Sequence, residues 1–247
     1  MERGLYIAAS GMIAEQIRQD QIANDLANAS TPGYKPDWSV QRSFEDVLLQ
    51  SSQTGRPVGT LSMGAHIARE VVDLGQGPLQ NTGQPLDVAL QGAGFFVVGT
   101  PAGARYTRDG QFVENASGQL TTDTGQPVLG TNGKPISIAG AKSAGDVSIA
   151  TDGRVTVNGR PAGTIAVVSL TNPAKLGGTL FSGTPGARPS GTTVEQGYLE
   201  GSGVSPVTTM VDMMTSFRNY QASQRAIQTL DTELGRAVTN VGSATGQ

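Results

Sequence analysis

The chain has 247 residues, a formal net charge of -3 at pH 7 and no cysteine. Its hydrophobic fraction of 37%, charged fraction of 15% and 34 glycines suit a folded, turn-rich protein with much β structure. The missing cysteine excludes disulfides, thiolate nucleophiles and cysteine metal sites, and the 17 scattered basic residues form no stripe that would hold nucleic acid.

The first element that the sequence predicts is a helix over residues 5–28. A heptad spacing carries this prediction, with Leu5, Met12, Gln19 and Leu26 on one seam and Ala8, Ile22 and Ala29 on its neighbour. Ser-Thr-Pro-Gly at 30–33 ends the helix, because proline disfavours helix in the preceding residue. The apolar run before Glu15 is short, so we expect neither a signal peptide nor a membrane span.

The middle of the chain, residues 34–200, is predicted to form an antiparallel β domain. Four turn dipeptides supply the positive φ angles of tight hairpins: Asp109-Gly110, Asn132-Gly133, Asp152-Gly153 and Asn158-Gly159. The strands that we expect include 95–99, 111–114, 147–150, 154–157 and 164–170. Stretches rich in Gly, Ser, Thr and Pro at 50–62 and 177–193 are expected to be exposed loops or domain joints.

A second and longer helix is predicted over residues 205–241. Its main seam, with a spacing of seven, comprises Met213, Tyr220, Ile227, Leu234 and Val241, and a partner seam comprises Met210, Phe217 and Val238. Isolated helices of this kind need a partner to be stable, so the two ends are expected to form a coiled-coil layer. The alternative is that both helices pack as surface helices on the central domain.

These elements predict an α+β fold in which a mainly antiparallel β domain is inserted between two terminal helices that form a coiled-coil or tube layer. The predicted domains are 1–33, 34–200 and 201–247. The boundaries follow the change from a helical spacing to short strands and back.

A search for chemistry in the sequence finds no convincing site. His66 is the only histidine and has no Gly-x-Ser-x-Gly partner motif. Asp123-Thr124-Gly125 matches an aspartic-protease tripeptide, but it stands in a polar turn without a second copy. Gly92-Ala93-Gly94 is followed by a predicted strand, where a dinucleotide motif requires a helix. We therefore expect no catalytic residue, metal site or cofactor.

Several segments resemble the flagellar rod and hook proteins. They are Ala-Asn-Asp-Leu-Ala-Asn-Ala-Ser-Thr-Pro-Gly-Tyr-Lys at 23–35, Leu-Asp-Val-Ala-Leu-Gln-Gly-Ala-Gly-Phe-Phe-Val-Val at 86–98, Tyr-Thr-Arg-Asp-Gly-Gln-Phe at 106–112, and the run from Gln-Gly-Tyr-Leu-Glu at 196–200 into the last helix. One departure is Gly-Ser-Gly-Val-Ser at 201–205, where the family usually shows Ser-Asn-Val-Asp or Ser-Asn-Val-Asn. Ser205 followed by Pro206 still makes a good helix start.

The resemblance implies a structural subunit of the basal-body rod, of the proximal, distal or Gram-positive type. Such a subunit self-assembles into the axial drive shaft, transmits torque and surrounds the export channel. Its partners would be copies of itself, other axial subunits and the type III export apparatus, at the basal body outside the inner membrane and without a cleaved signal. Nucleic acid, direct membrane insertion and cofactors are not expected. The expected assembly interface comprises Leu5, Met12, Ile22, Leu26, Met210, Met213, Phe217, Tyr220, Ile227, Leu234, Val238 and Val241.

Three alternatives remain open. The chain could be a hook-type axial subunit, which usually carries larger inserted domains. It could instead be a secreted β-rich adhesin or binding module. A wall hydrolase is the enzymatic alternative, and it would need a cleft with acidic residues or a metal.

Overall fold

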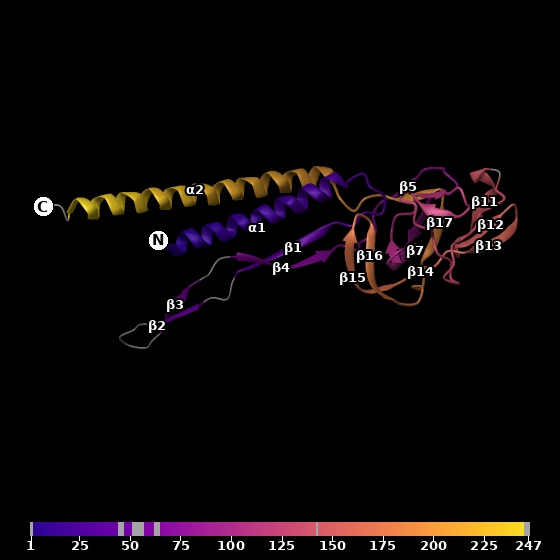
Figure 1. Cartoon of the computed structure of the whole chain (residues 1–247), viewed down its shortest axis with the longest axis horizontal. Coiled ribbons are helices and arrows are strands. Elements are labelled where there is room, and N and C mark those ends of the chain that lie inside the picture. Colours follow the sequence, from indigo (N-terminus) through magenta and orange to yellow (C-terminus); the bar gives the residue numbers. More distant parts are fainter. Residues whose placement is uncertain (1, 44–46, 51–56, 62–64, 142, 245–247) are drawn as a thin grey trace. The chain divides into compact units, whose positions relative to one another are not determined.

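A computed structural model describes residues 2–43, 47–50, 57–61, 65–141 and 143–244 (Figure 1). The chain forms two compact units. The first contains Met1–Leu26, Asp37–Val71 and Pro206–Gln247, and the second contains Ala27–Pro36 and Val72–Ser205. The three domains expected from the sequence, with boundaries after residues 33 and 200, stay a prediction. Within the described ranges, neither helix has an apolar stretch long enough to cross a bilayer.

Two long helices dominate the first unit, as predicted. Helix α1 spans Glu2–Ala27 and helix α2 spans Pro206–Ala244. Figure 1 shows them side by side, running in opposite directions. Helix α2 begins at Pro206, whose fixed φ angle and missing N–H suit the first helical position.

The described part of the first unit also contains four strands. They are β1 (Asp37–Ser43), β2 (Val47–Gln50), β3 (Pro57–Leu61) and β4 (Ala65–Val72). Strand β1 pairs with β4, and β2 pairs with β3 in antiparallel fashion. The prediction of a loop over 50–62 is therefore wrong for Gln50, which ends β2, and for residues 57–61, where Val58 and Thr60 favour a strand once β2 offers a partner. Residues 51–56 and 62 lie outside the described residues.

The second unit consists of short strands in several small sheets. The strands are β5 (Leu79–Asn81), β6 (Val88–Gln91), β7 (Phe95–Thr100), β8 (Gly103–Thr107), β9 (Phe112–Glu114), β10 (Leu120–Thr122), β11 (Val147–Ile149), β12 (Arg154–Val157), β13 (Arg160–Thr164), β14 (Val167–Val168), β15 (Leu170–Gly177), β16 (Leu180–Pro185), β17 (Thr193–Gln196) and β18 (Tyr198–Glu200), with a 3₁₀ turn at Ala144–Asp146. The largest sheet has the order β14-β7-β8-β16-β15. The others are β11-β12-β13, β6-β17, β5-β18 and β9-β10. Every pairing with a defined register is antiparallel, so the fold class is α+β as predicted.

Two apolar clusters hold this unit together. The larger gathers side chains from β6, β7 and the β11-β12-β13 sheet, with Val88, Phe96, Leu120, Val155 and Ile165 almost completely buried. The smaller lies on the other side of β7 and includes Phe95, Tyr106 and Phe181. Consecutive residues Phe95 and Phe96 thus enter different clusters, because side chains alternate along a strand.

Most turn predictions in this unit are confirmed. Asn158 and Gly159 have φ angles of 51° and 77° and connect β12 to β13, while Gly153 has a φ of 86° between β11 and β12. Asp109-Gly110 is different, since it joins no hairpin. A Cβ at Gly110 would collide with the backbone of Val88, so glycine is required there for close approach.

Two predictions in this unit are wrong. Residues 164–170 are not one strand but the end of β13, the short strand β14 and the start of β15. Residues 177–193 are not one loop, because β16 pairs with both β15 and β8. The Gly and Thr residues there resemble a loop in sequence, but Phe181 is fully buried and fixes the strand by tertiary packing.

Candidate functional site

Helices α1 and α2 approach each other through small residues. A Cβ at Gly4 would lie 3.2 Å from Leu230 Cδ1, and a Cβ at Gly11 would lie 3.8 Å from Ser223 Oγ. The residue numbers rise on one helix as they fall on the other, which fits an antiparallel pair. Glycine on α1 therefore allows a close approach along the first half of the helix.

A polar contact connects the same two helices further along. The Ser216 hydroxyl donates a hydrogen bond to Glu15 Oε2 at 2.6 Å. Ser216 is only 1% exposed, so this bond lies inside the helix pair. A buried hydroxyl needs such a partner, because an unsatisfied polar group in an apolar contact is costly.

The contacting residues define an inner seam on α2. Its members are half-buried, apart from the buried Ser216, and they follow one another at spacings of three and four: Thr209, Met213, Ser216, Tyr220, Ser223, Ile227, Leu230 and Leu234. Four of the five residues of the predicted main seam, Met213, Tyr220, Ile227 and Leu234, lie on this face. Beside the main seam, a second row of α2 residues contacts α1, namely Ser216, Ser223 and Leu230. The sequence predicts a different row in this place, the partner seam.

The predicted partner seam faces solvent instead. Met210 and Phe217 are each 51% exposed and Val238 is 72% exposed. Three further apolar residues, Val207, Val211 and Met214, extend the first two into a continuous row, the exposed α2 stripe (Val207, Met210, Val211, Met214 and Phe217). Apolar residues at these spacings share one helix face.

On α1 the four residues of the predicted assembly interface are half-buried or buried. Leu5, Met12 and Leu26 are half-buried and Ile22 is buried. The exposed apolar residues of α1 were not predicted, and they are Tyr6, Ile7, Ile13 and Ile17. Val241 lies in α2, and its side chain is outside the described residues.

A buried ion cluster forms in the second unit from Lys35, Arg108 and Glu200. Lys35 Nζ lies 2.5 Å from Glu200 Oε1, and Arg108 Nη1 lies 3.1 Å from Glu200 Oε2. The side chains of Lys35 and Glu200 are completely shielded from solvent. Burial lowers the pKa of Lys35, and the hydrogen bond to Glu200 opposes this shift.

The ion cluster is also bonded to the backbone around it. Lys35 Nζ donates to the Gly75 carbonyl at 2.6 Å, and Arg108 Nη2 donates to the Gly92 carbonyl at 2.9 Å. The Gly77 N–H donates to Glu200 Oε1 at 2.7 Å. Glu200 therefore accepts three hydrogen bonds, which is what a buried carboxylate needs.

Sequence reasoning missed this cluster. Its three charged residues stand in three separate segments that carry the family resemblance, at the end of Pro-Gly-Tyr-Lys, inside Tyr-Thr-Arg-Asp-Gly and at the end of Gly-Tyr-Leu-Glu. The available signal was that each of these segments carries a charged residue within, or at the end of, an apolar or turn-forming motif. Nothing in the spacing says that the three meet.

Glycine is required where the first of these segments crosses the second. Gly33 has a φ of 66°, and a Cβ there would collide with the backbone of Arg108 and Asp109. The Gly33 N–H donates to the Glu200 carbonyl at 2.8 Å. The N-terminal segment, the segment after β8 and the end of β18 thus touch through backbone atoms as well as through charges.

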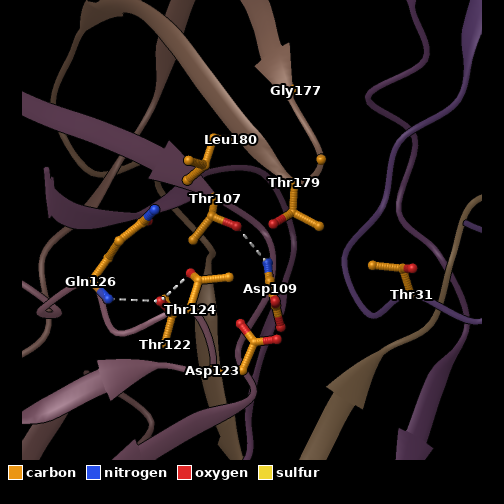
Figure 2. Close-up of a pocket in the computed structure, with 11 residues that line it drawn as sticks. Thr31, Thr107, Asp109, Thr122, Asp123, Thr124, Gln126, Gly177, Thr179 and Leu180 are labelled. Atoms are coloured by element: carbon orange, nitrogen blue, oxygen red, sulfur yellow. Dashed lines mark hydrogen bonds between the residues drawn. The ribbon is translucent and has the colours of Figure 1, made fainter. Parts of the chain in front are cut away.

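A polar pocket of about 210 Å³ lies beside this crossing, among threonines and two carboxylates (Figure 2). Asp109 and Asp123 point toward each other in Figure 2. Burial raises the pKa of Asp109 to about 6, and the charges of Asp123 and Asp87 act in the same direction. Asp123-Thr124-Gly125 forms the polar turn that was predicted, closed by a bond from the Gly125 N–H to the Thr122 carbonyl.

Two further candidates from the sequence, the glycines at 92 and 94 and His66, are placed by the structure. Gly92 and Gly94 adopt positive φ angles and lead into β7, as expected. His66 lies in β4, and its side chain is outside the described residues. Among the residues that the structure describes, no group of three or more His, Asp or Glu side chains is placed to hold a metal.

Three family models match the chain in order. Residues 5–35 match the flagella basal body rod protein, residues 89–157 match the flagellar hook protein FlgE/F/G D1 domain, and residues 195–240 match the flagellar basal body rod FlgEFG protein C-terminal. Each member of the ion cluster lies inside one of these matches, since Lys35 ends the first and Arg108 and Glu200 fall in the others.

Curated relatives match almost the whole chain. A flagellar basal-body rod protein FlgF of Caulobacter vibrioides is 34% identical over 90% of this chain and 91% of its own length. A flagellar basal-body rod protein FlgG of Borreliella burgdorferi is 34% identical over 96% and 98%. A flagellar hook-basal body complex protein FlhO of Bacillus subtilis is 32% identical over 98% and 99%. These relatives do not favour the hook-type alternative, and the chain belongs to the family of flagellar basal-body rod proteins as a structural rod subunit.

Proposed function

We propose that this rod subunit polymerises with copies of itself and with other axial subunits through the solvent-exposed apolar faces of α1 and α2. In the polymer, residues 1–33 and 201–247 form the inner tube around the export channel. Residues 34–200 form the domain that faces outward. Torque passes through the repeated contacts between subunits.

The observation that carries this proposal is the exposed α2 stripe. The inner seam of α2 is already used inside the chain, by contacts such as Ser216 with Glu15. The stripe and the exposed α1 residues Tyr6, Ile13 and Ile17 remain for contacts with neighbouring molecules. Helices that expose rows of apolar residues gain free energy when a repeated array covers them.

The proposal includes export in an unfolded state through the type III apparatus, without a cleaved signal, to the basal body outside the inner membrane. The absence of cysteine supports it, because no disulfide has to form or break during passage. The chain is proposed to act without catalysis and without a cofactor.

The test is a pair of neighbouring substitutions on the exposed face of α2. Phe217→Asp places a charge in the stripe, whereas Asn219→Asp adds the same charge at an exposed polar position two residues away. We expect Phe217→Asp to abolish polymer formation by the purified chain and swimming of complemented cells, with α-helix content unchanged. Asn219→Asp should retain both. Full polymerisation and swimming with Phe217→Asp would contradict the proposed interface.

A further inference from the structure

The second unit holds together the two segments that lead into the helices. The Gly33 N–H donates to the Glu200 carbonyl at 2.8 Å, and the Gly203 N–H donates to the Tyr34 carbonyl at 2.9 Å. Two backbone hydrogen bonds therefore connect the segment that follows α1 with the segment that precedes α2, and each segment donates one of them. Few residues separate these bonds from Ala27, where α1 ends, and Pro206, where α2 begins.

The ion cluster fixes this junction by side chains as well. Lys35 comes from the segment after α1, Glu200 from the segment before α2, and Arg108 joins the same carboxylate from the central strands. Charges that are completely shielded tolerate only arrangements in which each finds its partner, because an unpaired buried charge is very unfavourable. The cluster therefore selects one arrangement of the two segments.

The helix interface itself selects a register only weakly. The hydroxyl residues of the inner seam, Thr209, Ser216 and Ser223, recur every seven positions, and so do the apolar residues beside them. A slide of α2 by seven residues would bring Ser216 opposite Gly11 and would offer Glu15 a hydroxyl from Thr209. Such a slide moves the helix by about 10 Å and replaces most contacts with similar ones.

We infer that the Lys35–Glu200–Arg108 ion cluster sets the register of α1 against α2. Lys35 and Glu200 are positioning residues: they lie outside both helices, in the chain segments that lead into them, and they fix the points from which the two helices start. The register decides which exposed residues of α1 lie beside the exposed α2 stripe. It is a property of the single chain, and only its consequence for polymerisation rests on the proposed function.

The absence of cysteine allows the register to be measured by disulfide formation in the full chain. The native pair is Gly11→Cys with Ser223→Cys, because a Cβ at Gly11 lies 3.8 Å from Ser223 Oγ. The shifted pair is Gly11→Cys with Ser216→Cys, which reports a slide of one heptad. In the otherwise unchanged chain, we expect the native pair to oxidise at least about tenfold faster than the shifted pair, because only its thiols are held close together.

Lys35→Met is the first variant to combine with both cysteine pairs. It leaves Glu200 paired with Arg108, so the second unit should still fold, as its thermal unfolding will report. We expect the preference for the native pair to fall about tenfold, to near equality with the shifted pair. The control is Arg154→Met, which removes the exposed Arg154–Asp152 pair of the same unit and should keep the full preference.

A second variant leaves the ion cluster intact and separates it from the helix. About twelve Gly and Ser residues are inserted between Ser205 and Pro206, which makes the connection flexible. We expect the native-pair preference to disappear here too, and this variant serves even if Lys35→Met does not fold. Retention of the full preference in the insertion variant, or in a folded Lys35→Met chain, would overturn the inference. A chain that keeps its register but does not polymerise would support the inference and contradict the proposed function.

Discussion

Ser216 on α2 donates a hydrogen bond of 2.6 Å to the carboxylate of Glu15 on α1. Ser216→Ala should destabilise the helix pair by about 1 kcal/mol, because the carboxylate loses a partner inside the contact. Hydrogen exchange of α1 amides will measure the effect. Thr215→Ala is the matched control, since that exposed hydroxyl bonds only to the Val211 carbonyl of its own helix. Equal effects of the two substitutions would show that the hydrogen bond between Ser216 and Glu15 does not stabilise the helix pair.

Gly33 should tolerate no side chain. Gly33→Ala combines a φ of 66° with a collision against the backbone of Arg108 and Asp109. Gly83 has the same φ of 66° with nothing within 4 Å of the position that a Cβ would occupy, so Gly83→Ala isolates the conformational cost of about 1–2 kcal/mol. We expect Gly33→Ala to cost at least about 2 kcal/mol more in unfolding free energy, measured by urea denaturation. Similar losses in the two variants would contradict the close packing at Gly33.

The stability of the second unit should depend on pH through Asp109. Its pKa is raised by burial to about 6, above the value of 3.8 for a free carboxyl. The folded state therefore binds this proton more tightly than the unfolded state. The unfolding free energy should fall as pH rises from about 4 to about 6, and should stay lower above that range, by up to about 3 kcal/mol.

Asp109→Asn tests this dependence directly. The amide oxygen can still accept the bond from the Gln111 N–H, which the carboxylate accepts at 3.0 Å. The variant should be more stable than the parent at pH 7 and should lose the difference below pH 4. Asp123→Asn, at an exposed position, should change the pH profile much less. Parallel pH profiles for parent and Asp109→Asn would mean that Asp109 does not titrate in this range.

Ile227→Asp should weaken the pairing of α1 with α2 without changing the stability of the second unit. Ile227 is half-buried on the seam that faces α1, so a carboxylate there costs about 1–3 kcal/mol of helix pairing. We expect faster hydrogen exchange in α1, loss of polymerisation and loss of swimming, with thermal unfolding of the second unit unchanged. Swimming cells would contradict the role of the seam, and a lower melting temperature of the second unit would favour helices that dock on the β domain.

In dilute solution, the isolated chain should be monomeric, and its helices should be less protected from hydrogen exchange than its second unit. The second unit is held by two clusters of buried apolar residues, whereas the apolar residues of the inner seam, such as Ile227 and Leu234, are only half-buried. Sedimentation will report the mass, and hydrogen exchange will compare 72–205 with the helices. Uniformly slow exchange over α1 in a proven monomer would contradict this expectation.

Elements with strong local signals could be predicted from the amino-acid sequence. Heptad spacing located both helices to within a few residues, and Asn158-Gly159 located a hairpin because its φ angles are intrinsic to those residues. The same local signals failed for 177–193, where Gly and Thr suggested a loop. Strand β16 forms there because Phe181 finds a buried place beside Phe95, a contact between residues far apart in sequence.

Which faces and charges meet depends on contacts between distant segments, and the folded chain was needed to find them. Heptad spacing placed Ile227 and Phe217 on apolar seams, but it could not say that the first is half-buried and the second is exposed. The face of α2 that meets α1 is the one opposite Gly4 and Gly11, which carry no apolar signal and lie close to Leu230 and Ser223. Lys35 and Glu200 are 165 positions apart and resemble ordinary surface charges in the sequence. They pair because the fold of the second unit brings both segments together in its interior, where both side chains are completely shielded from solvent and neither charge is stable without the other.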